Sequence, residues 1–123
     1  MLKQRLLEFI NDDEDPIKNY LLGLEYEFIG QTASAFSFYL RASERTDNKD
    51  LAYECLIRQG NMFKSQGNRK ISVESMYQSA IAFYPERPEA YYYFSKFAEE
   101  IKEYHESYML ACIGLSMSTR PIQ

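Results

Sequence analysis

The chain of 123 residues has no tryptophan, one histidine, two cysteines and only five glycines. One histidine and two distant cysteines cannot supply the ligand cluster of a zinc site, so we expect no metal and no cofactor. No apolar run approaches the roughly 20 residues of a membrane-spanning helix, and the N-terminus lacks the pattern of a signal peptide. The 14 basic residues are outnumbered by 18 acidic ones and form no long block, which disfavours nucleic acid as a partner. We therefore expect a cytoplasmic protein that neither enters a membrane nor binds nucleic acid.

The residues that are present fit one folded domain. Hydrophobic residues make up 46% of the chain and charged residues 26%, which is too apolar for a disordered segment and short for two domains. Cys55 and Cys112 lie within apolar helical patterns, so we expect both to be buried, reduced thiols. A disulfide between them is the alternative.

The few glycines reveal an internal repeat. Gly23 and Gly30 lie seven residues apart, as do Gly60 and Gly67. Gly60 follows Gly23 by 37 residues, and aromatic residues place a third copy with Ser95 another 35 residues on, where Lys102 takes the second glycine position. A period in the mid-thirties indicates stacked supersecondary units.

Small residues recur at three positions of each copy. One is on the first helix and two are on the second, where paired helices can approach closely only if side chains are small. In chain order these are Gly23, Ala35 and Ala42, then Gly60, Ser72 or Val73, and Ala80, then Ser95, Ser107 and Gly114. With these positions, residues 16–121 resemble the tetratricopeptide repeat family, although Asn19, Leu56 and Tyr91 replace its usual first-helix tryptophan.

The predicted fold is all-α, with antiparallel helix hairpins stacked as a short right-handed α-solenoid. Its divisions are an N-terminal helix and acidic linker over 1–15, then repeats over 16–49, 50–86 and 87–121. Apolar residues recur every three or four positions and never alternate as in a strand. Local signals agree: Asp15-Pro16 and Arg87-Pro88 open helices, Asp50 caps another, Gly30 and Gly67 end first helices, and Pro85 stops a second one.

No catalytic constellation is evident, so we expect no enzyme. The acidic segment 11–15 lacks the alternating ligands and central glycine of a calcium loop. His105 has no nucleophile beside it. We interpret a set of carboxylates on the later helices as a solvated face, namely Glu99, Glu100, Glu103 and Glu106.

The family resemblance implies that function lies on a concave groove lined by the first helices. Its equivalent positions here are Tyr20, Leu24, Glu27, Ile57, Asn61, Lys64, Tyr92, Lys96 and Glu99. Amide, lysine and aromatic groups together suit a peptide or protein segment, with amide hydrogen bonds, ion pairs and apolar contact. Within the run Tyr91 to Phe94, we expect Tyr91 and Phe94 to pack inward and Tyr92 to face away. The predicted function is a non-catalytic protein–protein interaction module, an adaptor or scaffold.

The C-terminal end of the stack has no predicted cap. Tyr108, Ile113 and Leu115 are left as an apolar face there, although solenoid ends normally carry a polar cover. We therefore expect either self-association through this face or a continuation of the chain. A weaker resemblance, over residues 85–90, 106–108 and 114–116, is to helical-repeat regions that accompany glycosyltransferases. It leaves an accessory or structural role, beside oligomerisation, as the alternative function.

Overall fold

The computed structural model describes residues 1–11 and 13–118, and the side chains of residues 10, 11 and 118 lie outside what it describes. Within these residues all secondary structure is helical, which confirms the all-α prediction. The helices are α1 (Leu2–Asn11), α2 (Pro16–Phe28), α3 (Thr32–Arg45), α4 (Lys49–Gln66), α5 (Lys70–Phe83), α6 (Glu89–Glu100) and α7 (Tyr104–Ser118). None of them is long and apolar enough to cross a bilayer.

Capping side chains fix where the helices begin. Asp15 accepts a hydrogen bond from the backbone N–H of Ile17 at 3.0 Å, and Pro16 is the first helical residue of α2, as predicted. The cap of α4 is Asn48 rather than Asp50, because the Asn48 side-chain oxygen accepts from the N–H groups of Asp50 (2.9 Å) and Leu51 (3.2 Å). Asp50 instead lies in the first turn, where its charge complements the helix dipole.

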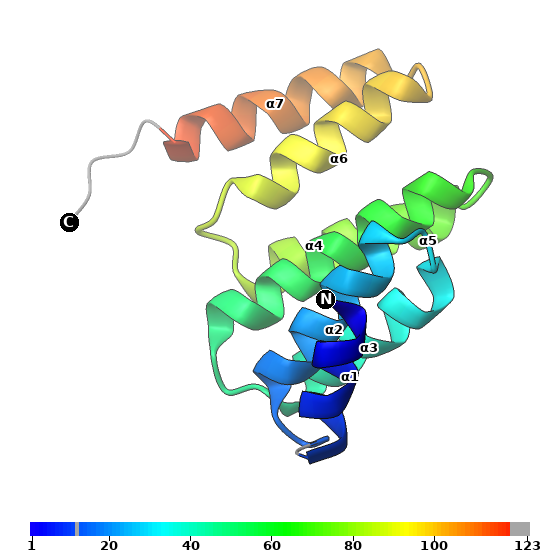
Figure 1. The fold of residues 1–123 in the computed structure, drawn as a ribbon. Helices are drawn as coiled ribbons and strands as arrows, with labels where there is room; N and C mark the ends of the chain where they lie inside the picture. Colours follow the sequence, from blue (N-terminus) through cyan, green and yellow to red (C-terminus); the bar gives the residue numbers. More distant parts are fainter. Residues whose placement is uncertain (12, 119–123) are drawn as a thin grey trace.

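Helices α2–α3, α4–α5 and α6–α7 form three antiparallel hairpins, stacked in chain order in a helical-repeat solenoid (Figure 1). The turn inside each hairpin includes a residue with positive φ: Gly30 (82°), Gly67 (75°) and Lys102 (66°). Lys102 stands at the position of the third repeat that corresponds to Gly30 and Gly67 in the first two. Helix α1 covers the first hairpin, where Phe9 packs edge-on against Phe38 at 5.3 Å between ring centroids.

The predicted small residues lie where helices approach most closely. A Cβ atom added at Gly23 would lie 2.7 Å from Cε1 of Tyr39, and one added at Gly60 would lie 2.7 Å from Cε1 of Tyr77. In the third hairpin Ser95 takes the glycine position and its hydroxyl donates to the backbone oxygen of Ser107 at 2.8 Å. The corresponding second-helix residues are buried, namely Ala35, Ala42, Val73, Ala80, Ser107 and Gly114.

The two cysteines differ in environment. Both are free, and Cys55 is fully buried in the core between α3 and α4. The prediction that Cys112 is also buried is wrong, because this residue is exposed. It lies on α7, the last described helix, whose outer side no described helix covers.

Candidate functional site

The predicted groove residues of α2 take part in the internal packing of the first hairpins. Tyr20 and Leu24 pack against the core cluster that contains Tyr39. The Glu27 carboxylate accepts a hydrogen bond from the Tyr39 hydroxyl at 2.5 Å and pairs with Arg58 of α4 at 3.3 Å. Burial, followed by the nearby Glu54 carboxylate, raises the pKa of Tyr20 to about 12. The predicted groove residues of α2 therefore mainly stabilise the packing of α4 against the first hairpin.

A cavity of about 500 Å³ lies between α4 and the start of α6. The predicted residues Ile57 and Asn61 line it, together with Arg58, Arg87 and Tyr93. Both arginines are already neutralised: Arg58 contacts Glu27 and Glu54, and Arg87 contacts Asp50 (2.7 Å) and Glu89. Burial lowers the pKa of the Arg58 guanidinium, but Tyr20 and Tyr39, followed by the two carboxylates, raise it above its ordinary value. The hydrogen bond with Glu89 raises the pKa of Arg87. The cavity is polar but offers no unpaired arginine to an anion.

A second cavity, of about 320 Å³, continues from the first one, since Asn61 and Tyr93 line both. The Asn61 side-chain oxygen accepts from the Tyr77 hydroxyl at 2.5 Å, so its amide hydrogens are the groups it can offer to a ligand. Lys64, also predicted, pairs with Glu100 at 2.9 Å and is half-buried.

A third cavity, of about 600 Å³, lies between α6 and α7 and is here called the α6–α7 pocket. It shares Tyr93 and Lys96 with the second cavity. Its other lining residues are Pro88, Glu89, Tyr92, Ser95, Ala111, Gly114 and Leu115. Tyr92 is 57% exposed while Phe94 is buried, as the helical periodicity predicted. Glu99 is exposed but lines none of these three cavities.

The residues that sequence reasoning missed are Arg58, Arg87 and Tyr93. Tyr93 lines all three cavities. The sequence does not predict this, because adjacent residues of a helix point in different directions and Tyr92 is the residue expected to face the groove. The arginines reach the first cavity through ion pairs to other hairpins, with Asp50 and Glu27 as partners. No sequence pattern marks such long-range pairs.

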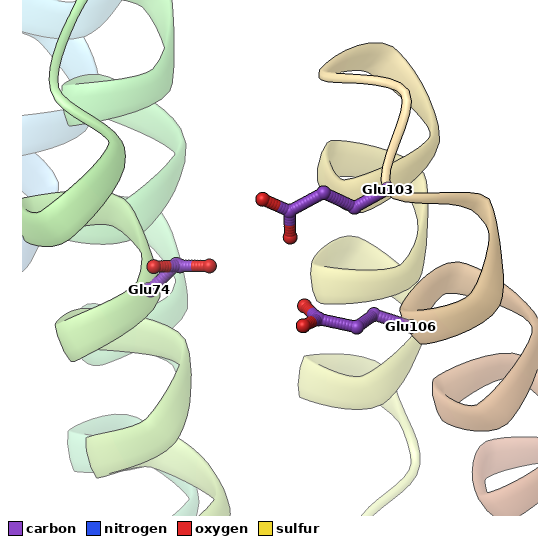
Figure 2. Close-up of side chains that lie close together, drawn as sticks. All are labelled: Glu74, Glu103 and Glu106. Atoms are coloured by element: carbon purple, nitrogen blue, oxygen red, sulfur yellow. The ribbon is translucent and has the colours of Figure 1, made fainter.

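A separate group of carboxylates lies at the turn between α6 and α7. Oxygen atoms of Glu74, Glu103 and Glu106 lie within 4.8 Å of one another, with Glu74 pointing across from α5 (Figure 2). Lys70 pairs with Glu103 and lowers the pKa of that carboxyl, whereas the neighbouring Glu103 raises the pKa of Glu106. Glu99, Glu100 and Glu106 are exposed, as expected for a solvated face, and Glu103 and Glu106 also point toward Glu74 of α5. Since Lys70 already balances part of the charge, we assign no ion to the cluster.

The predicted end face is exposed in the structure. Tyr108 and Leu115 are 68% and 67% exposed, and Ile113 is exposed as well. Tyr104 and Met109 of the same helix are also exposed. Helix α7 thus presents several large apolar side chains that no described helix covers.

Paired helices, close contacts at small residues and hairpins stacked in order define a tetratricopeptide-like solenoid. Two crystal structures of MamA are similar to this chain. One superposes with a TM-score of 0.81 at 16% identity over 95% of this chain, the other with 0.79 at 16% identity over 94%. The chain spans 66% and 61% of their respective lengths.

At this identity the likeness shows the fold alone. No protein-family model matches the sequence, and no curated protein matches it. The two MamA structures give no support to the resemblance to regions that accompany glycosyltransferases.

Proposed function

We propose that the chain is a non-catalytic protein–protein interaction module that binds a peptide or protein segment in its concave groove. The observation that carries this proposal is the row of three adjoining cavities along α4, α6 and α7. Five of the nine predicted groove residues line them: Ile57, Asn61, Lys64, Tyr92 and Lys96. A row of connected cavities suits a segment that lies along the surface better than one compact substrate.

The chemistry of the groove supports a peptide partner. Asn61 presents amide hydrogens in a cavity that Tyr93 also lines, and Tyr92 adds an exposed aromatic side chain. Amide donors bind peptide carbonyl groups, and exposed tyrosines are frequent anchors of protein interfaces. Arg58, Lys64 and Arg87, which line the cavities, are each held in an ion pair with a carboxylate, an arrangement that differs from a nucleophile beside a base.

The test is affinity capture with the purified chain, followed by mass spectrometry and measurement of the affinity of the captured protein. We expect Tyr92→Ala to weaken binding roughly tenfold or more, because an exposed aromatic anchor is lost. Ile71→Ala is the matched control, since Ile71 is an exposed apolar residue of α5 that lines no described cavity.

Asn61 needs its own control. Asn61→Ala removes both the groove amide and the acceptor for the Tyr77 hydroxyl, whereas Tyr77→Phe removes only the hydrogen bond between them. We expect Asn61→Ala to weaken binding and Tyr77→Phe to leave it within about twofold. Equal affinity of the wild type, Tyr92→Ala and Asn61→Ala for the partner would refute the groove as the binding site.

Self-association is a second candidate function, favoured by the exposed apolar residues of α7. Tyr108, Ile113 and Leu115 gather on one terminal helix, and apolar ends of repeat stacks associate when uncovered. Sedimentation over a range of protein concentrations tests it. A mass that rises with concentration, and that Tyr108→Lys returns to the monomer, supports this function, whereas a constant monomer mass contradicts it.

We also propose the cytoplasm as the location of the chain. Both cysteines are free, which agrees with a reducing compartment. Fractionation of the native cells, with detection by an antibody, tests this proposal, and recovery of the protein outside the cytoplasm contradicts it.

A further inference from the structure

The α6–α7 pocket occupies the place where the first two hairpins carry a buried tyrosine. Tyr39 lies four residues after Ala35 and three before Ala42, and Tyr77 has the same spacing to Val73 and Ala80. Counting in the same way from Ser107 and Gly114 leads to Ala111 in the third hairpin. Tyr39 and Tyr77 are fully buried, whereas Ala111 is exposed and lines the pocket.

The facing residue changes together with the tyrosine. In the first two hairpins each tyrosine ring lies directly on a glycine, at Gly23 or Gly60. In the third hairpin the facing residue is Ser95, which is joined to Ser107 by hydrogen bonds of 2.8 and 2.9 Å. Serines thus hold α6 and α7 together, and the volume that a ring fills elsewhere is left as a pocket.

The pocket also has a positively charged residue at its rim, the exposed Lys96. Lys96 follows Ser95 directly, as Asn61 follows Gly60, and Asn61 is the group that binds the Tyr77 hydroxyl. The Lys96 ammonium lies 5.4 Å from the ring centroid of Tyr92 and forms no ion pair within the described residues. The carboxylate of Glu89, which also lines the pocket, is bound by Arg87. Of the two charged groups that line the pocket, the Lys96 ammonium is therefore the one available to a ligand.

We propose that the α6–α7 pocket receives a tyrosine side chain from a protein partner, with its phenolic oxygen accepting a hydrogen bond from Lys96. An electron-rich ring and an oxygen lone pair complement the ammonium and the neighbouring Tyr92 ring. In the first two hairpins a Cβ opposite the tyrosine would lie 2.7 Å from its ring, so by analogy we expect the Cβ of Ser95 to crowd a ring attached to residue 111. A ring on another chain can enter from the open side. This inference rests on the proposed function and names one side chain that the partner must supply.

The first test uses para-cresol, which carries the tyrosine ring and hydroxyl, with toluene as its matched control. In amide-resolved NMR titrations we expect para-cresol to shift signals of Tyr92, Ser95, Lys96 and Ala111 with a dissociation constant on the order of millimolar. We expect toluene to bind severalfold more weakly, and Lys96→Met to remove the difference between the two compounds. Absence of shifts at these residues, or equal binding of both compounds by the wild type, overturns the inference.

Filling the pocket gives the second test. Ala111→Tyr is expected to weaken para-cresol binding more than tenfold. The double variant Ser95→Gly with Ala111→Tyr restores the glycine and tyrosine of the first two hairpins, and serves if the single variant folds poorly. Ala82→Tyr is the control, because Ala82 is an exposed alanine of α5 that does not line the pocket. Unchanged binding of para-cresol by a folded, filled variant overturns the inference.

The captured partner separates this inference from the proposed function. A partner that binds Ala111→Tyr at least tenfold more weakly than the wild type, but binds Ala82→Tyr normally, supports the pocket. A partner that binds Ala111→Tyr normally but is lost with Asn61→Ala overturns the pocket and leaves the groove function intact. Loss with Ala111→Tyr but not with Asn61→Ala supports the pocket and contradicts the wider groove.

Discussion

Replacing Gly60 by alanine tests the close contact on which the second hairpin is built. The added Cβ would lie 2.7 Å and 3.0 Å from two carbon atoms of the Tyr77 ring, well inside van der Waals contact. The ring has little room to retreat. Its hydroxyl is bound to Asn61, and the rings of Tyr93 and Phe94 lie nearby at centroid distances of 6.5 and 5.8 Å.

Two opposing effects set the size of the change. Adding a methyl group to a tightly packed core costs about 1–3 kcal/mol, and the short contact places this site in the upper part of that range. Alanine is the better helix former by about 1 kcal/mol. We therefore expect Gly60→Ala to lower the free energy of unfolding by about 1–2 kcal/mol.

Urea unfolding followed by far-ultraviolet circular dichroism measures this change, and a double-mutant cycle identifies its cause. In a Tyr77→Leu background, where the ring is absent, Gly60→Ala is expected to be neutral or stabilising by up to about 1 kcal/mol. The reasoning is refuted if Gly60→Ala stabilises the wild type, or if its effect is the same in both backgrounds.

Four further predictions concern Gln59, Lys102 and the cysteines. Both polar side-chain atoms of Gln59 are buried without a hydrogen-bond partner within the described residues, so Gln59→Met is expected to stabilise the chain by about 1–3 kcal/mol in urea unfolding; destabilisation would contradict it. Lys102 has a φ of 66°, so Lys102→Gly should stabilise by about 1 kcal/mol, and a lower thermal midpoint would argue against strain at this turn. Burial raises the pKa of Cys55 to about 12 while Cys112 is exposed, so one thiol should react with a disulfide reagent at pH 8 before denaturation and two after it. Because folding raises that pKa, ionisation of the unfolded Cys55 thiol favours unfolding as pH rises above its unfolded value; a Cys55→Ala variant that loses stability just as steeply at high pH would contradict this.

The repeat was readable because close helix contacts restrict side-chain size. Gly23 and Gly60 face tyrosine rings, and a chain poor in glycine shows such positions clearly. Lys102 shows the limit of this signal. Its backbone has the same positive φ as Gly30 and Gly67, and the repeat period placed it there, although lysine by itself gives no indication of a left-handed turn.

The proposed groove residues of α4 and most of those of α6 line cavities, whereas those of α2 line none of the three described. Helical periodicity identifies which residues share a face of a helix, and it places Asn61 and Tyr92 on faces that line cavities. Periodicity does not show how much of a helix face the next hairpin covers. Tyr20 and Leu24 of α2 are partly buried against the core cluster to which α4 contributes. Ion pairs between hairpins, such as Arg87 with Asp50, depend on the stacking of the units and leave no local pattern. The same reason explains the error at Cys112, whose helix has no following hairpin in the described residues.

Within a repeat, the positions that depart from the pattern are where function is best sought, because packing accounts for the others. In the first two hairpins the tyrosine ring packs against a glycine and occupies the space that a Cβ would take. Its hydroxyl donates a hydrogen bond to the carboxylate of Glu27 in the first hairpin and to the side-chain oxygen of Asn61 in the second. In the third hairpin both members of the pair change. If only the glycine position had changed to serine, the Cβ of Ser95 would crowd a tyrosine at position 111. If only the tyrosine position had changed to alanine, there would be a void between α6 and α7 without the serine hydrogen bonds that join the two helices. With both changed, serine hydrogen bonds join the two helices, and a pocket lies beside Lys96, which forms no ion pair within the described residues. Packing alone explains neither the pocket nor the position of Lys96, which is why binding is assigned to this hairpin.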